Sequence, residues 1–285
     1  MNKKRYKQLF VSIAAGGIKI LLITLISAFT ALPFVWMISS CLKPGSEVMS
    51  SSSFLPSTVT WDNLISVITS SPIPTYIFNT MWISLVIVAL QVITSALLAY
   101  ALVFMKFRSR NILFGIIMAT YMLPVAATYI PSYIILSKMN LLNTFTGLII
   151  SSTVSTFGIF QLRQAFMQIP KSLVEAARID GSSHLEILCN IVGPMTKSSF
   201  ITLGLMSFIS AYNNYMWPSL ITNDPAKYLV SQGLRSFFIE GGAYGTNWGL
   251  VMAASAVIIV PLLVMFALTE KWFVNGIGGE TGVKG

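Results

Sequence analysis

The side chains that commonly carry out chemistry are few in this sequence and lie far apart. It holds nine carboxylates, one histidine and two cysteines in 285 residues. His184 has no second histidine and no HExxH context, so neither a zinc site nor a histidine-based catalytic set is predicted. Cys41 and Cys189 are one widely separated pair, which is neither a metal-ligand motif nor a disulfide framework. A phosphate-binding loop would read GxxxxGK[ST], and Lys197-Ser198 lacks the glycine before it. We therefore expect no catalytic residues, no metal and no nucleotide bound by such a loop.

The composition is that of a membrane protein. Charged residues make up 9% of the chain, against about 25% in an ordinary soluble domain, and hydrophobic residues make up 55%. So few charges cannot cover a water-facing surface, which excludes a soluble enzyme, a disordered protein and a small secreted domain. The net charge is +9, but the basic residues lie in short groups between apolar runs. This distribution is typical of loops beside a membrane and argues against a nucleic-acid partner.

Six apolar stretches are long enough to cross a bilayer, which takes about 20 residues of helix. The predicted spans are Ile20–Ser40, Met81–Phe104, Ile112–Leu136, Leu142–Gln161, Ser198–Leu220 and Asn247–Leu268. The fourth has hydroxyl side chains at its centre, Ser151 to Thr153, Ser155 and Thr156, so we expect it to face protein or water. Ser95/Ala99 and Gly249/Ala253 have the spacing that allows close helix packing.

The distribution of Lys and Arg predicts that both termini lie inside. In that orientation the outer loops hold only Lys43, Lys138, Lys227 and Arg235, and most basic residues are cytoplasmic. The first apolar run is too long for a signal peptide, so it is predicted to be an uncleaved span. None of the acidic residues lies within a span. Ion-coupled carriers usually need such a counter-charge, so a secondary carrier is disfavoured.

The inner loop between the fourth and fifth spans is the longest charged stretch. Ser172 with Glu175, and Ser183 with Glu186, each fit a capping box. Gly181 between them predicts a sharp bend joining two short helices. On the first helix, one side is shared by Leu173, Ala176, Ala177 and Asp180. The two alanines leave little side-chain bulk there, as a helix seated in a partner's groove requires.

This loop resembles the EAA signature of ABC importer permeases. Glu175-Ala176-Ala177 is followed after three residues by Gly181, and then by Ile191-x-x-Pro194. One position departs from the signature, because the family usually has leucine where this chain has Gly193. The Glu-Ala-Ala-x3-Gly spacing is intact.

Further matches are similar to the second permease subunit of maltose-type carbohydrate importers. They are Trp61-Asp62-Asn63 and Asn79-Thr80, which look like that group's outer-loop pattern, Tyr212-Asn213-Asn214-Tyr215-x-Trp217-Pro218, Tyr228-Leu229-Val230, and the end of the chain from Trp272 to Gly276 and Gly282 to Gly285. The resemblance therefore covers most of the chain. It implies a multi-pass protein of the prokaryotic plasma membrane.

The resemblance implies roles for several groups of residues. The EAA helix would couple to a separate ATPase through Glu175, Ala176, Ala177, Arg178, Asp180 and Gly181. The tail residues Val283, Lys284 and Gly285 would also contact the ATPase pair. The outer loop Thr222 to Thr246 would meet an extracytoplasmic binding protein through Tyr228, Arg235, Phe237, Phe238 and Tyr244. A polar and aromatic cluster could line a sugar path or anchor the helix, and its members are Tyr212, Asn213, Asn214, Tyr215 and Trp217.

The fold expected is an all-α integral membrane protein with six spans and the type I ABC importer permease fold. It has a cytoplasmic segment 1–19, one transmembrane domain 20–268 that contains the coupling loop 170–194, and a cytoplasmic tail 269–285. The expected partners are a second permease, two ATPase subunits that hold ATP and Mg²⁺, a solute-binding protein and membrane lipid. Two alternatives stay open: an ABC permease for another solute such as a polyamine or phosphate, and an ion-coupled carrier.

Overall fold

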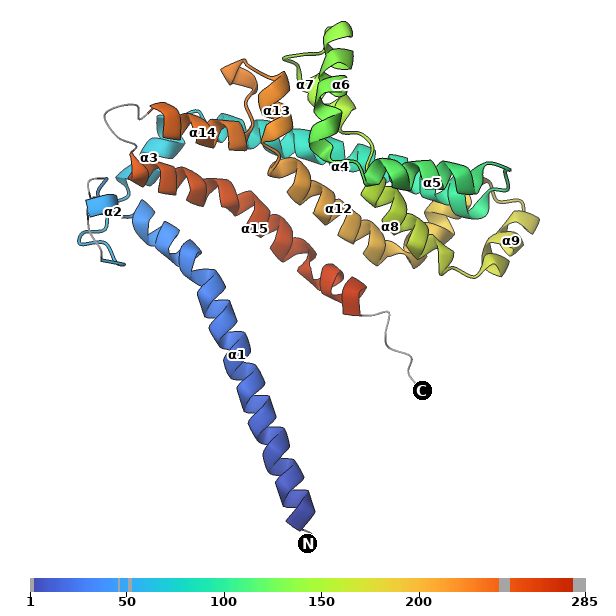
Figure 1. The fold of residues 1–285 in the computed structure, drawn as a ribbon, viewed down its shortest axis with the longest axis horizontal. Helices are drawn as coiled ribbons and strands as arrows, with labels where there is room; N and C mark the ends of the chain where they lie inside the picture. The colour runs from blue at the N-terminus through green and yellow to red at the C-terminus, as the bar shows by residue number, and fades with distance from the viewer. Residues whose placement is uncertain (1–2, 46, 51–52, 241–246, 279–285) are drawn as a thin grey trace. The chain divides into compact units, whose positions relative to one another are not determined.

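The computed structural model describes residues 3–45, 47–50, 53–240 and 247–278, and every regular element among them is helical (Figure 1). The chain's contacts fall into two compact units. The first is Met1–Ser71 with Phe237–Val257, and the second is Pro72–Ser236 with Ile258–Gly285. Each is considered by itself.

In the first unit, helix α1 (Lys3–Cys41) is a long apolar helix with little packing around it. Every described side chain from Gly16 to Val35 is exposed. A helix that is apolar on all sides and unpacked is suited to contact with lipid. The predicted first span, Ile20–Ser40, lies wholly within α1.

The segment after α1 is held by polar side chains. Asn63, on helix α3 (Asp62–Thr69), donates from Nδ2 to the carbonyl oxygens of Cys41 and Lys43, at 3.2 and 2.8 Å. The Lys43 side chain is buried, and its Nζ lies 2.6 Å from the carbonyl oxygen of Ser53. A Cβ at Gly249 would lie 2.8 Å from Asn63 Nδ2, so glycine permits this close approach. Helix α2 (Glu47–Ser50) lies in the same segment.

Helix α4 (Ile73–Phe104) is the centre of the second unit. It packs against α8 (Thr156–Met167) and α12 (Lys197–Tyr212), which also pack against each other (Figure 1). Ser95 and Ala99 are fully buried, which confirms the packing predicted from their spacing. The helix begins at Ile73, eight residues before the predicted start at Met81, so Asn79 and Thr80 are helical and the outer-loop interpretation of this pair is wrong.

Two predicted spans are broken rather than continuous. Ile112–Leu136 is divided into α5 (Arg110–Tyr121) and α6 (Val125–Lys138), which meet at 102°. Pro124 stands at the break, where it has no backbone N–H to continue the ladder. Leu142–Gln161 is divided into α7 (Phe145–Ser151) and α8, which meet at 42°. Each of these two predicted spans is therefore a bent pair of helices.

The break between α7 and α8 lies at the hydroxyl-rich centre of the predicted fourth span. Its free carbonyl groups need donors, because no water is available in the middle of a bilayer. Three side chains of α4 supply them: Gln91 Nε2 to Ser152 at 2.8 Å, Thr94 Oγ1 to Thr153 at 2.9 Å, and Ser95 Oγ to Ser155 at 3.5 Å. The expectation that this centre faces protein is confirmed.

The predicted fifth span Ser198–Leu220 is also interrupted. Helix α12 ends at Tyr212, and the short α13 (Met216–Ile221) follows after a break of three residues. The sixth prediction, Asn247–Leu268, lies within the longer α15 (Trp248–Gly278), except for Asn247 itself. Among the described residues, three helices are long and apolar enough to cross a membrane, or up to five segments if each bent pair is one span.

The predicted outer loop 222–246 contains regular structure. A 3₁₀ turn, η2 (Pro225–Lys227), is followed by helix α14 (Val230–Glu240). The side chain of Gln232 accepts the Leu229 N–H at 3.1 Å and so caps the start of α14. Describing this segment as a loop throughout is therefore wrong.

At Gly158, α8 lies close to both α4 and α12, and this glycine supplies a test of the packing. A Cβ there would lie 2.6 Å from Ser95 Oγ and 2.8 Å from Leu203 Cδ1. We expect Gly158→Val to destabilise the protein by about 1–3 kcal/mol through overpacking, measured as a lower midpoint of thermal unfolding in detergent. Gly115→Val is the control, because a Cβ at Gly115 meets nothing within 4 Å. An equal effect of the two changes would contradict this account of the α4–α8 contact.

Candidate functional site

Helix α9 (Lys171–Ile179) is the first half of the charged loop. It begins directly after Pro170, and the Leu173 N–H bonds to the Pro170 carbonyl at 3.1 Å. Ser172 is therefore inside the first turn and is not the N-cap, and no side-chain cap is formed. The capping box predicted for Ser172 and Glu175 is wrong, because the extended backbone of Pro170 starts the helix earlier.

The bend and the second cap agree with the sequence. Gly181 has φ +85°, a conformation that residues with a Cβ rarely adopt, and it ends α9. Ser183 then caps α10 (His184–Ile187) with the full capping box: its N–H donates to Glu186 at 2.7 Å, and its Oγ accepts the Glu186 N–H at 3.3 Å. Hydrogen bonding from Ser183 to the Glu186 carboxylate lowers the pKa of Glu186. The chain thus leaves α9 in one defined direction.

One face of α9 is packed against the core of the second unit. Val174 and Ala177 are buried. Their cluster includes Tyr100 and Phe104 of α4 and Phe166 of α8. The prediction placed Ala177 on a face for a partner, and this is wrong, because Ala177 packs inward. The small alanine side chain instead brings α9 close to its own chain.

The opposite face of α9 is exposed and partly apolar. Ile179 is 87% exposed and Leu173 is 45% exposed. Glu175, Ala176 and Asp180 are exposed as well. Apolar side chains of this size beside charged residues on a loop helix are typical of a surface that another protein covers.

Arg178 and His184 connect the loop to the end of α4. The Arg178 guanidinium donates to the Phe104 carbonyl at 3.1 Å and lies 3.4 Å from His184 Nδ1. The same nitrogen is 3.1 Å from the hydroxyl of Tyr100. Arg178 was expected to be a polar contact to a partner; although exposed, it contacts its own chain here. Arg178 thus ties the C-terminal end of α9 to the end of α4.

The connection to α12 contains a π-helix, η1 (Leu188–Val192), then the short α11 (Gly193–Met195). Pro194 has no N–H to donate to the preceding turn, and a wider turn accommodates that loss. Gly193 replaces the leucine usual in the signature, and a Cβ there would lie 3.0 Å from the Leu188 carbonyl oxygen. The departure in sequence therefore coincides with the irregular turn.

The predicted sugar-path cluster does not stay together. Tyr212 is fully buried and its hydroxyl donates to the Ile258 carbonyl at 2.8 Å, so it packs α12 against α15 and lines no open path. Trp217 is also buried; its Nε1 donates to Ser151 at 2.8 Å and its ring stacks on Tyr129. Asn213 is exposed. Of the five residues, Asn213 alone is fully accessible.

Asn214 and Trp217 border a small cavity between α4, α7, α12 and α13. Its volume is about 70 Å³, and Gln91, Ser152 and Ser210 add polar atoms to its wall. A water molecule occupies about 30 Å³ in the liquid, and sites for small-molecule ligands are commonly about 300 Å³ or more. This space therefore fits water and is too small for a sugar. Gln91, which the sequence interpretation missed, is recognisable as a polar residue within an apolar run, whereas Ser152 belongs to the predicted hydroxyl-rich centre of the fourth span.

The segment that leads into α14 is bonded to α4. Asn79 Nδ2 donates to the carbonyls of Ala226 and Tyr228, at 3.0 and 3.2 Å, and Thr80 Oγ1 accepts the Val230 N–H at 2.9 Å. These side chains explain why an Asn-Thr pair occurs in an apolar helix. Tyr228, a predicted docking residue, is half-buried with its ring 6.0 Å from that of Tyr76.

The other predicted docking residues are only partly described. Arg235 is exposed, with its guanidinium 5.8 Å from the ring of Tyr215. Phe237 and Phe238 lie in the helical backbone of α14. Tyr244 and the tail residues Val283, Lys284 and Gly285 lie outside the described residues.

Several features of the chain agree with a known family. They are the apolar helices, the bend at Gly181 after α9 and the capped turn at Ser183. Residues 91–276 match the binding-protein-dependent transport system inner membrane component family. The chain belongs to this family. Its members are transport permeases rather than enzymes, and the resemblance to ABC importer permeases is confirmed.

Curated relatives match most of the permease. The arabinooligosaccharide transport system permease protein AraQ of Halalkalibacterium halodurans is 30% identical over 262 residues, which are 90% of this chain and 93% of that one. The sn-glycerol-3-phosphate transport system permease protein UgpE of Yersinia enterocolitica is 36% identical over 208 residues, 73% of this chain and 74% of that one.

The fold of the permease is also that of a solved structure. A chain from the crystal structure of a bacterial ABC transporter involved in alginate import matches with a TM-score of 0.82, at 23% identity, over 92% of this chain and 98% of that one. A chain from a second structure, an alginate transporter in complex with an alginate pentasaccharide-bound periplasmic protein, matches with a TM-score of 0.58 at 14% identity, over 98% of both chains. These matches confirm an all-helical importer permease fold.

Gly181 tests whether the bend positions α9. A Cβ at Gly181 meets nothing within 4 Å, so a substitution acts through the positive φ alone. We expect Gly181→Ala to cost about 1 kcal/mol and to speed hydrogen exchange in 171–183, measured by mass spectrometry. Gly115→Ala is the control, since Gly115 lies within helix α5 and a Cβ there meets nothing within 4 Å. Unchanged exchange in 171–183 of the Gly181 variant would contradict a role for this backbone conformation.

Glu186 tests the capping box through pH. Its folded-state pKa is lowered, so its contribution to stability is fully present above the ordinary pKa of a glutamate and is lost as pH falls through the lowered value. The difference in unfolding midpoint between the native chain and Glu186→Gln should be largest at neutral pH and shrink in acid. Glu175→Gln removes the same charge on α9 and serves as the control. Identical pH profiles of the two variants would exclude the cap as the cause.

Proposed function

We propose that this permease is one of two membrane subunits of an ATP-driven importer for a carbohydrate. In this proposal it has six spans with both termini in the cytoplasm. Helices α12 and α13 together are counted as the sixth span, in addition to the five segments that are long and apolar enough to cross a membrane. A second, different permease completes the pathway. Two ATPase subunits hold ATP and Mg²⁺, this chain binds no cofactor, and a solute-binding protein delivers the substrate from outside.

The observation that carries the proposal is the two-faced helix α9. Its inner face is fixed to α4 and α8 through Val174 and Ala177, and its outer face leaves Ile179 and Leu173 uncovered. A helix packed in this way can move only together with the helices behind it. Closure of two ATPase subunits against the outer face would therefore tilt the membrane helices and change the side to which the pathway opens.

Carbohydrate import is supported by the relatives and by the outer segment. AraQ is named for arabinooligosaccharides, and the structure with the higher TM-score belongs to an alginate importer. UgpE is named for sn-glycerol-3-phosphate, so a phosphorylated polyol is the second candidate substrate. The small cavity beside Trp217 has no room for either substrate. We infer that most of the binding site is contributed by the second permease.

The decisive experiment measures ATP hydrolysis by the complex that co-purifies with the tagged permease. Candidate binding proteins are added with an oligosaccharide, with sn-glycerol-3-phosphate, or without ligand. Stimulation that depends on one loaded binding protein supports import and identifies the substrate class. Absence of any co-purifying ATPase would exclude the proposal and favour an ion-coupled carrier.

Ile179 tests the coupling face directly. We expect Ile179→Arg to place a charge in the covered contact and to lower co-purification of the ATPase about tenfold or more, as hot-spot changes of 2 kcal/mol do. Leu55→Arg is the matched control, because Leu55 is also strongly exposed and lies in a predicted outer segment. The amount of ATPase per permease is measured after affinity purification. Equal retention of the ATPase by both variants would show that α9 is not the contact.

A further inference from the structure

The short connection between α4 and α5 forms a concentrated positive surface. Lys106, Arg108 and Arg110 line an open cavity of about 490 Å³ together with Phe107 and Asn111. These five residues are called the basic cavity below. From the sequence, these three cations contributed only to the count of basic residues that predicts which loops are cytoplasmic.

Among the described residues, no carboxylate forms an ion pair with the basic cavity. Within the part of the chain that the structure describes, the one side-chain ion pair is Lys227–Asp224, which lies elsewhere. Helix α5 has no acidic residue in its first turn, and its N-cap Ser109 makes no side-chain cap. The positive end of the helix dipole therefore adds to the three cations. Such an accumulation of positive charge is stabilised when an anion binds to it.

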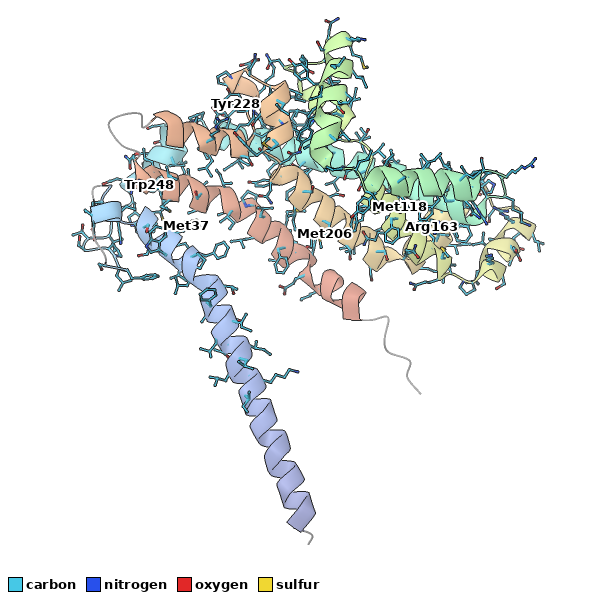
Figure 2. All side chains as sticks on the ribbon, viewed as in Figure 1. Met37, Met118, Arg163, Met206, Tyr228 and Trp248 are labelled. Atoms are coloured by element: carbon cyan, nitrogen blue, oxygen red, sulfur yellow. The ribbon has the colours of Figure 1, made fainter. Side chains whose placement is uncertain are left out.

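A fourth cation lies beside this surface. Arg163 is on α8, where that helix packs against α5 (Figure 2), and its guanidinium carbon is 3.9 Å from the centre of the Phe114 ring. Arg110 begins α5, the helix against which α8 packs. The Nε of Arg163 is buried and has no hydrogen-bond partner among the described residues. Arg163 thus contributes charge and an unsatisfied donor on the side of α8.

The position of the basic cavity favours a lipid over a free anion. It lies between the end of α4 and the start of α5, and both helices belong to segments apolar enough to span a bilayer. Along α5, Ile112 and Ile116 are 67% and 57% exposed, and no residue of α5 is buried. A phosphate group bound at the basic cavity would therefore have an uncovered apolar surface directly beside it, where acyl chains can lie.

We propose that the basic cavity binds the headgroup of an anionic phospholipid of the cytoplasmic leaflet. Lys106, Arg108 and Arg110 contact the phosphate, Arg163 adds to the positive potential, and the exposed face of α5 contacts the acyl chains. Basic pockets at the cytoplasmic ends of membrane helices recognise lipid headgroups in this way. The bound lipid also neutralises the positive charge of these cations. They follow Phe104 in the chain, whose carbonyl accepts the hydrogen bond from Arg178 of the coupling helix α9.

Native mass spectrometry of the full chain in detergent tests this site, with phosphatidylglycerol and phosphatidylcholine as probes. We expect the native chain to prefer phosphatidylglycerol. The triple variant Lys106→Gln/Arg108→Gln/Arg110→Gln should lose affinity for it, on the order of fivefold for each cation removed, with phosphatidylcholine binding unchanged. The control Lys171→Gln/Lys197→Gln/Lys271→Gln removes the same charge from three other exposed lysines of the predicted inner face and should retain the preference.

A second pair of measurements separates a lipid from other anions. Ile112→Ser/Ile116→Ser leaves the cations in place, and it should weaken phosphatidylglycerol binding while the chain elutes as a folded species. Competition by inorganic phosphate as strong as that by the lipid would show a free-anion site and overturn the proposal. An equal loss in the basic-cavity and control variants would overturn it as well. So would a basic-cavity variant that loses its co-purifying ATPase but keeps its lipid preference, because the surface would then bind a protein.

Discussion

The structure depends on satisfying backbone polar groups where water is absent. The break between α7 and α8 frees carbonyl groups in the middle of an apolar segment, and α4 supplies their donors from Gln91, Thr94 and Ser95. Unsatisfied, each such group would cost several kcal/mol in a lipid environment. Helix α4 is therefore required beside the break, and Gly158 allows α8 and α12 to pack closely at the same level.

This arrangement links the predicted cytoplasmic and outer ends of the second unit through α4. Near its C-terminal end, α4 holds the coupling loop through the Phe104 carbonyl and Tyr100, which bond to Arg178 and His184. Near its other end, Asn79 and Thr80 hold the segment that leads into α14. One continuous helix, α4, thus bonds to the loop that contains α9, to the broken segment and to the outer segment.

The second unit contains several irregular elements. The breaks at Pro124 and after Tyr212, and the π-helix before Pro194, each interrupt the hydrogen-bond ladder of a helix. Such points can change angle without unfolding a whole helix. The packed core around Phe166 and Val174 holds α9 against α4 and α8, and Leu188 and Val192 of the π-helix also belong to it.

The sequence alone determined the membrane class, the positions of the apolar segments, the Gly181 bend, the Ser183 cap and the EAA resemblance. These features depend on local composition or on residues a few positions apart, which propensity and capping rules describe. The sequence interpretation failed where distant residues decide the structure. The broken fourth segment is stable because α4 bonds to it. Ala177 and Tyr212 are buried because α9 and α12 pack inward. Asn79 can lie within an apolar helix because its side chain has acceptors near Tyr228. The basic cavity is formed by neighbouring residues of one short connection, and only the tertiary structure shows that its cations make no ion pair among the described residues.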